Sequence, residues 1–333
     1  MSDSTLEQAP TILEIGEEYP PAGEEQTIEQ LRQLHLRVQH VEPGPNRRGE
    51  HPKGHCGLWA TFHVESGIPQ EFRTGLFKEE RTYTALIRLS SGRVADDRMP
   101  DVHGMAVKVL IPQEGKEPLQ QDFILADHAV FFGRNVQHVL DFLIATAGGT
   151  PASTLAMTTH PALIGFTSKA KASPLALSYW SQTPYKAGRG AVKYFVLPSP
   201  ARLIPAISLS DSPDCLREAM IEQLTARKMG AEFDFCVHPQ TDAAAMPVED
   251  PTVEWKSQAV KLATIAIYPQ KFDSPEQASF VENLSWSPWN ALQEHRPLGG
   301  VNRARQEVYR ESKDLRHQTN GIASAPITGR EWF

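Results

Sequence analysis

Hydrophobic and polar residues alternate over several short segments of the chain, as they do in β-strands with one buried face. Seven segments combine this pattern with many β-branched and aromatic side chains, which favour strands. Because these segments fall into two groups along the chain, we expect one antiparallel sheet system that closes into a barrel. The predicted strands are 58–64, 82–90, 104–110, 121–125, 191–197, 232–237 and 257–268.

The spacing of apolar residues typical of helices appears before, between and after these groups of strands. Ile28, Leu31 and Leu34 recur on one face of a predicted helix over 24–40. Between the two groups of strands, the segment 134–190 is predicted to be a helical or irregular insertion that several prolines interrupt. Further helices are expected toward the C-terminus.

Together these elements predict an α+β fold. Its centre is a closed antiparallel β-barrel of about eight strands, with a helical insertion and C-terminal helices. The domain is expected to span residues 24–325. An extended N-terminal arm with several prolines and few clustered apolar residues precedes it over 1–23, and a short tail follows over 326–333.

The composition is that of an ordinary globular protein. The chain has 333 residues, 40% of them hydrophobic, and a formal net charge of −7, which excludes collagen-like, coiled-coil and wholly disordered chains. Without a basic run, it lacks the phosphate-neutralising surface of a nucleic-acid-binding protein. The polar, acidic N-terminus and the lack of a long apolar window predict a cytoplasmic protein that does not enter a membrane.

Several kinds of catalytic or metal site are missing from the sequence. Cys56, Cys215 and Cys236 are widely spaced and odd in number, so we expect buried free thiols rather than disulfides or a zinc site. The sequence contains no GxSxG, Walker A or HExxH motif, and no GxGxxG after a strand. These absences disfavour hydrolases and nucleotide-binding enzymes.

The C-terminal segment 302–316 points to a different chemistry. If it is a helix, Arg305 and Tyr309 share one face, where the guanidinium stabilises the phenolate form of the tyrosine. Proteins use a tyrosinate as an axial ligand of ferric haem. Haem also carries two carboxylates, which paired arginines can bind. The candidate arginines are Arg48, Arg88 and Arg316.

Five pieces of the chain, within residues 40–320, resemble in order and spacing the motifs of the haem catalase family. RGEHPKG (48–54) resembles the family's R-x-x-H-A-K-G. This resemblance implies that His51 is the distal base, which moves a proton during cleavage of the O–O bond, and that Arg48 binds a haem propionate. DVHGMAVKV (101–109) and HAVFFGR (128–134) look like two further family motifs.

The two remaining matches carry the other implied haem contacts. Arg88-Leu-Ser90-Ser resembles the family's R-F-S-T, which implies that the arginine binds a propionate and that the serine bonds the distal histidine. Arg88 and Ser90 are two apart on a predicted strand and so project from one face. Arg305, Tyr309 and Arg316 have the spacing of the family's axial-tyrosine segment. The resemblance therefore implies haem b, with ferric iron, and Tyr309 as the metal ligand.

The chain departs from the family pattern above the implied haem. The position of the family's distal asparagine falls on Ala126, and either Asp127 or His128 is a candidate to replace it. The family's channel-narrowing valine corresponds to Gly92, and a family phenylalanine corresponds to Val139. Both changes open space. Because the chain also stops soon after the axial helix, it resembles a minimal catalase core similar to the catalase-related peroxidases, and we expect no bound NADPH.

These resemblances and departures predict a haem peroxidase that reduces organic hydroperoxides, and hydrogen peroxide, with a small one-electron donor. Alternatives are a hydrogen peroxide dismutase (catalase), a fatty-acid hydroperoxide isomerase of the allene oxide synthase type, and a barrel that binds haem or lipid without turnover. A homo-oligomer is expected by analogy. The predicted catalytic residues are His51, Ser90 and Asp127, and the predicted haem-binding residues are Arg48, Arg88, Arg305, Tyr309 and Arg316.

Overall fold

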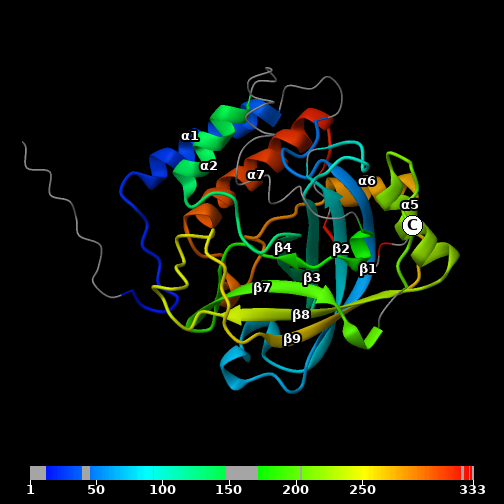
Figure 1. The fold of residues 1–333 in the computed structure, drawn as a ribbon, viewed down its shortest axis with the longest axis horizontal. Helices are drawn as coiled ribbons and strands as arrows, with labels where there is room; N and C mark the ends of the chain where they lie inside the picture. Colours follow the sequence, from blue (N-terminus) through cyan, green and yellow to red (C-terminus); the bar gives the residue numbers. More distant parts are fainter. Residues whose placement is uncertain are drawn as a thin grey trace, which may run out of the picture.

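The computed structural model describes residues 13–39, 46–92, 94–147, 172–202, 205–323, 326–329 and 331. Its centre is an antiparallel sheet of nine strands in the order β5-β4-β3-β2-β1-β9-β8-β7-β6. The two-residue strand β5 pairs with both β4 and β7, and this closes eight of the strands into a barrel. The predicted closed antiparallel barrel in an α+β fold is therefore confirmed (Figure 1).

All seven predicted strands are present in the structure. The strands are β1 (Lys53–Val64), β2 (Arg81–Ser91), β3 (His103–Gln113), β4 (Lys116–Ala126), β5 (Tyr179–Trp180), β6 (Tyr185–Ala187), β7 (Gly190–Pro198), β8 (Ala231–Pro239) and β9 (Val260–Ile267). The strands β5 and β6 were not predicted. They are only two and three residues long, which is too short for a pattern of alternation to be visible.

The helices lie along one side and at one end of the barrel (Figure 1). The α-helices are α1 (Glu24–Gln39), α2 (Val136–Thr146), α5 (Cys215–Ile221), α6 (Pro275–Asn283) and α7 (Gly300–Asn320). Short 3₁₀ turns span Gln70–Phe72, Gly75–Phe77, Pro174–Ala176, Pro200–Arg202 and Gln293–His295, and a π-turn spans Glu222–Ala226. Of the predicted insertion, residues 148–171 lie outside the described ones. No helix in the described ranges has the length and hydrophobicity needed to cross a bilayer.

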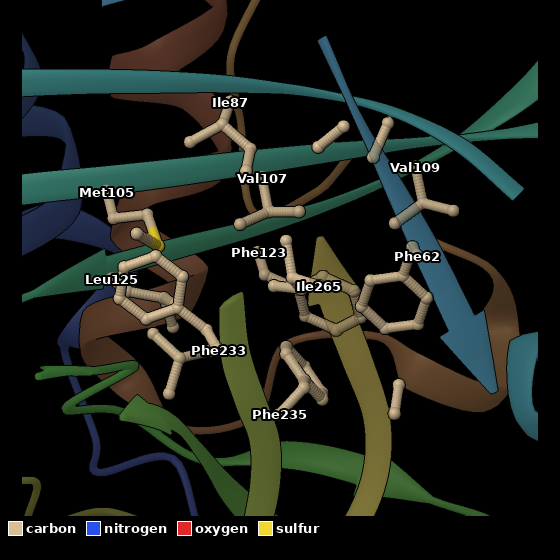
Figure 2. Packing of buried hydrophobic residues seen from close by; sticks show 14 of the residues in the cluster. Phe62, Ile87, Met105, Val107, Val109, Phe123, Leu125, Phe233, Phe235 and Ile265 are labelled. Atoms are coloured by element: carbon tan, nitrogen blue, oxygen red, sulfur yellow. The ribbon is translucent and has the colours of Figure 1, made fainter. Parts of the chain in front are cut away.

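Aromatic side chains fill the interior of the barrel. Phe62, Phe123, Phe233 and Phe235 meet there from opposite strands, as Figure 2 shows. The ring centroids of Phe123 and Phe235 are 4.7 Å apart, and those of Phe62 and Phe235 are 5.1 Å apart. The interior is thus a packed core, as in other small barrels, and a ligand has to bind elsewhere.

Strand periodicity gives the wall formed by β2, β3 and β4 two different faces. Tyr83, Ala85, Ile87 and Leu89, which alternate along β2, belong to the barrel core. Arg88 and Ser90 alternate with them and therefore point away from the core. The outward face of this wall carries Arg88, which was predicted to bind haem, and Ser90, which was predicted to be catalytic.

Helices α1, α2 and α7 pack together against this outward side (Figure 1). Leu31 from α1, Val136 and Leu140 from α2 and Ala304 from α7 form their shared apolar cluster. The predicted first helix is confirmed. Its expected last residue, His40, lies outside the described ones.

Residues of the N-terminal arm are bound to the start of α7. The carboxylate of Glu18 accepts hydrogen bonds from the backbone of Gly299, at 2.8 Å, and from Arg303, at 2.7 Å. Glu249 accepts from the backbone of Gly300 at 2.8 Å. These acidic groups pair the N–H groups that a helix leaves free at its N-terminus. At the other end of the chain, Ile327 from the predicted tail is buried against the barrel.

The three cysteines are free and buried, as the sequence predicted. Burial raises the pKa of the Cys56 thiol to about 12. A thiol that stays protonated at neutral pH is a poor nucleophile, so Cys56 acts as a packing residue.

Candidate functional site

A cavity of about 650 Å³ lies between the outward face of β2–β4 and helix α7. Its volume is within the range of small-molecule and cofactor sites. The barrel wall contributes mostly small or apolar residues together with a guanidinium and a hydroxyl: Arg88, Ser90, Gly104, Ala106, Ile124 and Ala126. The helix contributes Val301, Ala304, Arg305, Val308, Tyr309 and Arg316.

His51 lines this cavity from the segment that precedes β1. Its backbone has φ of 53°, a conformation that costs energy for a residue with a side chain. Two hydrogen bonds hold it there: the backbone N–H donates to Gly92 O at 3.0 Å, and Arg88 Nη2 donates to His51 O at 2.8 Å. The ring nitrogen Nδ1 lies 3.3 Å from Ser90 Oγ. The predicted pairing of His51 with Ser90 is thus present in the structure.

The electrostatic environment keeps the His51 ring neutral. Burial lowers its pKa below the ordinary 6.5, and the negative charge of Glu50 offsets only part of this effect. A neutral imidazole has one ring nitrogen that can accept a proton. Because Nδ1 is engaged with Ser90, Nε2 is the nitrogen suited to exchange a proton with a ligand in the cavity.

Gly104 makes room for the His51 ring. It pairs with Ser90 across β2 and β3, and a Cβ atom on it would lie 2.8 Å from His51 Nδ1 and 3.0 Å from Ser90 Oγ. Such contacts are closer than van der Waals distances allow. A glycine is therefore required directly behind the imidazole.

Tyr309 lies on the opposite wall of the same cavity, on α7. One turn earlier on the helix, Arg305 donates from Nη2 to Tyr309 Oη at 2.9 Å, and its guanidinium lies 5.2 Å from the centre of the tyrosine ring. Burial disfavours the charge of Arg305, but its attraction to Tyr309 and Tyr185 raises the pKa above its ordinary value. Arg305 is therefore a permanent cation beside the phenol oxygen, as the helical spacing predicted.

Arg48, Arg88 and Arg316 gather at one edge of the cavity. The last carbonyls of α6 hold two of them: Glu282 O accepts from both Arg48 and Arg316, and Leu284 O accepts from Arg48 at 2.9 Å. Cations are stabilised at a helix C-terminus by such free carbonyls. We refer to these three arginines as the arginine cluster.

The arginine cluster carries more positive charge than the protein neutralises. Burial and the charge of Arg48 lower the pKa of Arg88 to about 9 and that of Arg316 to about 10. Glu282 is the carboxylate that offsets part of this repulsion, at 3.3 Å from Arg48 and 3.6 Å from Arg88. A crowded set of cations with one carboxylate is suited to bind an anionic ligand.

Asp127 is bound to the start of β3. Its carboxylate accepts from the backbone N–H of His103 at 3.0 Å and lies 3.1 Å from His103 Nδ1, and it is not among the residues that line the cavity. The neighbouring His128 is also outside the lining, with Nδ1 3.1 Å from Val130 O. The negative charge of Asp127 still acts on His51 and favours its protonated form. A role for Asp127 or His128 in place of the distal asparagine stays a prediction.

The positions that depart from the catalase pattern do lie in the cavity. Ala126, Gly92 and Val139 all line it. Asp101 lines it as well, with carboxylate oxygens that accept hydrogen bonds from the backbone of Val94 and Val102. The rest of this part of the lining is predominantly apolar: Met99, Pro100, Phe131, Phe132, Val136, Phe142 and Leu143.

Sequence reasoning missed three residues at the site. Glu282 contacts the arginine cluster from α6, and Trp286 lines the cavity. Gln182 lines it too, with φ of 62° and a hydrogen bond from Nε2 to Val130 O at 2.9 Å. None belongs to a recognisable motif.

The residues around the cavity fit a haem. The described part of the chain contains no group of three or more His, Cys, Asp or Glu side chains that could hold a metal ion. A porphyrin supplies most of the ligands of its own iron, so a single protein oxygen such as that of Tyr309 is sufficient. The arginine cluster has an excess of positive charge and lies at the edge of a largely apolar cavity. This arrangement suits the two carboxylates of haem b.

Comparisons with known proteins are informative only at the level of structure. No protein-family model matches the sequence, and no curated protein resembles it significantly. Solved structures that match over 93% of this chain include catalase A from Saccharomyces cerevisiae, at 16% identity and a TM-score of 0.64. A bacterial catalase matches at 15% identity and a TM-score of 0.61, and a fungal catalase at 14% and 0.65.

This chain covers 70%, 64% and 66% of those three proteins, respectively. It therefore spans about two thirds of their length. The match includes the closed barrel, and the resemblance noted in the sequence motifs agrees with it. The chain has the catalase fold.

Proposed function

We propose that this protein binds haem b in the cavity between β2–β4 and α7 and uses it to reduce peroxides. The observation that supports this most strongly is that His51 and Tyr309 line one cavity from its two sides. Each is held by a partner that suits the proposed role, since Ser90 engages His51 Nδ1 and Arg305 donates to Tyr309 Oη. When bound, ferric haem supplies the redox chemistry that splits an O–O bond.

Residues from both walls of the cavity would hold the cofactor. Tyr309 would provide an oxygen ligand for the iron, and Arg305 donates a hydrogen bond to that oxygen. Arg48, Arg88 and Arg316 would bind the propionates. Because α6 carbonyls already fix Arg48 and Arg316, little side-chain entropy remains to be lost on binding.

His51 would move the proton that peroxide cleavage requires. Its neutral ring would accept the O–H proton of the hydroperoxide at Nε2 and return it to the other peroxide oxygen, which leaves as an alcohol, or as water when the substrate is hydrogen peroxide. Ser90 holds Nδ1 and so fixes the direction of the ring. The strained backbone at His51 is maintained by its bonds to Gly92 and Arg88.

The cavity favours organic hydroperoxides as substrates. Ala126 and Gly92 carry little or no side chain, and Val139 is smaller than the phenylalanine that the resemblance placed there. The neighbouring apolar lining can bury a hydrocarbon group. We therefore propose peroxidase activity with a small one-electron donor. A homo-oligomer and a cytoplasmic location stay predictions from the sequence.

Hydrogen peroxide dismutation is the second candidate function. It is favoured by the structural likeness to solved catalases. It is disfavoured by Ala126, which offers no polar group to hold hydrogen peroxide beside His51, and by the bonding of Asp127 to His103.

The two candidates are separated by mixing the haem-loaded protein with hydrogen peroxide and with cumene hydroperoxide, with and without a one-electron donor. Donor-dependent consumption of cumene hydroperoxide without oxygen release supports the peroxidase. Rapid oxygen release from hydrogen peroxide alone supports the catalase. Stoichiometric haem binding without turnover of either peroxide contradicts both, and turnover of a fatty-acid hydroperoxide without a donor indicates an isomerase.

A further inference from the structure

Glu282 places a carboxylate inside the arginine cluster, next to the proposed propionate site. Its Oε2 atom lies 3.3 Å from Arg48 Nε and 3.6 Å from Arg88 Nη2. The side chains of Arg48 and Arg88 are 14% and 6% exposed and that of Glu282 is 35% exposed, so water screens part of this contact. The carboxylate offsets part of the positive charge of the cluster.

Backbone carbonyls accept most of the hydrogen bonds of the guanidiniums. Arg48 donates to Glu282 O and Leu284 O, Arg316 donates to Glu282 O, and Arg88 donates to His51 O. The carboxylate adds one bond, from Arg48 Nε to Glu282 Oε2 at 3.3 Å. Replacing the carboxylate by an amide would remove a charge and leave the bonds to backbone carbonyls in place. The main effect of Glu282 on the cluster is consequently electrostatic.

The balance of charges in the cluster suggests what this role is. Three guanidiniums and one carboxylate leave two net positive charges at the cavity edge. The nearby Lys313, which also lines the cavity, is paired with Asp314 at 2.7 Å. Two positive charges match a ligand that carries two carboxylates.

We propose that Glu282 moderates the attraction of the arginine cluster for the two propionates of haem, because its carboxylate reduces the charge of the cluster to two and lies against two of its guanidiniums. This inference rests on the proposed haem site. Glu282 and the propionates share the same guanidiniums, so their negative charges compete. Loss of the carboxylate should make the cluster attract the propionates more strongly.

A comparison of two ligands with two protein forms tests this competition. Purified apo-protein, as wild type and as Glu282→Gln, is titrated with haem b and with its dimethyl ester, which has no carboxylate charge. Binding is followed by the haem absorption band and by quenching of tryptophan fluorescence, since Trp286 lines the cavity. The quantity of interest is the ratio of the dissociation constants of ester and haem b.

We expect this ratio to be about fivefold larger in Glu282→Gln than in the wild type, because an anion that lies beside two guanidiniums has been removed. The difference should shrink as salt is added. Glu282→Asp keeps the charge and should restore a ratio near that of the wild type. Glu276→Gln, at the exposed N-terminal end of the same helix, makes the same charge change and should leave the ratio unchanged.

An unchanged or smaller ratio in Glu282→Gln, with wild-type haem binding intact, overturns the role of Glu282 and leaves the proposed function standing. Failure of the wild type to bind haem overturns the proposed function itself and this inference with it. Circular dichroism and thermal unfolding of each apo-variant establish that it is folded. If Glu282→Gln does not fold, the same ratio is measured in Glu282→Asp and in the wild type at increasing salt concentrations. A ratio that does not change with salt contradicts the proposal.

Discussion

Arg88 donates a hydrogen bond from Nη2 to the main-chain carbonyl oxygen of His51 at 2.8 Å. The same side chain belongs to the arginine cluster, which is proposed to bind the propionates, and holds the backbone of His51, the proposed distal base. Changes at the propionate edge are therefore expected to alter proton transfer on the other side of the cavity.

Replacement of Arg88 by lysine tests this coupling. Lysine keeps the positive charge but lacks the planar guanidinium that can contact His51 O and a carboxylate together. We expect haem affinity to fall about tenfold, equivalent to about 1.4 kcal/mol, and turnover of the loaded enzyme to fall as well. Arg81→Lys, at the exposed start of the same strand, is the matched control. Lower affinity with unchanged turnover would show that the bond to His51 O has no catalytic consequence.

His51→Asn should abolish most peroxide turnover while haem still binds. Asparagine tolerates the positive φ at this position better than alanine does, so the variant removes the imidazole with little backbone strain. General acid–base catalysis contributes about 10²- to 10⁴-fold, and we expect a loss in that range. Stopped-flow measurement of the reaction with cumene hydroperoxide provides the rate. The control is His63→Ala, which changes a partly exposed histidine on β1 and should leave the rate unaltered. Equal rates in the wild type and His51→Asn would exclude His51 as the base.

The pH dependence of turnover should follow the lowered pKa of His51. The ring must be neutral to accept a proton, and burial holds its pKa in the folded protein below 6.5. Activity should therefore persist as the pH falls through 6.5 and be lost only when the pH passes through the lowered pKa. A pH profile of kcat/KM, measured with thermal unfolding at each pH, checks this. An acid limb with its midpoint above 6.5 would contradict a neutral, buried His51.

Tyr309→Phe removes the proposed axial oxygen. Haem affinity should fall by more than about tenfold. Removing a residue that only hydrogen-bonds to a metal ligand already lowers metal affinity by about that factor or more, and Tyr309 is the proposed ligand itself. The absorption spectrum of any haem that still binds should change, because the oxygen ligand is gone. Tyr268→Phe removes the hydroxyl of an exposed tyrosine and serves as the control. Identical spectra and affinities for wild type and Tyr309→Phe would show that the iron ligand lies elsewhere.

Gly104→Ala should displace the imidazole of His51 while the histidine itself is unchanged. The new Cβ would lie 2.8 Å from His51 Nδ1, so either the ring or the strand has to move. A misplacement of this kind costs about 10- to 100-fold in turnover. Haem affinity should change much less. Gly67→Ala introduces the same methyl group where nothing lies within 4 Å, and a similar loss of turnover there would point to a general effect on the fold.

The sequence predicted those parts of the molecule in which local spacing carries the information. All seven long strands show alternation, and Arg305 and Tyr309 meet because residues four apart on a helix are neighbours. The helix α5 has seven residues and was not predicted, since a helix of that length shows little periodicity.

Other parts depended on contacts between distant segments, which spacing does not encode. Asp127 binds His103 because β3 and β4 pair in a register that brings the ends of these strands together, and no local pattern distinguishes this partner from the cavity. Glu282 meets Arg48 from a position 234 residues away along the chain. The motif resemblance placed His51 near Ser90 correctly, but it could not show that the cavity lies outside the barrel.

The two faces of the β2–β4 wall have a consequence for how such a protein can change. Ile87 and Leu89 are constrained by the packing of the core, whereas Arg88 and Ser90, on the same strand, line the cavity. Substitutions at one set of alternate positions can therefore change the cavity while the other set preserves the fold. This separation is consistent with a barrel that keeps the catalase fold at 14–16% identity.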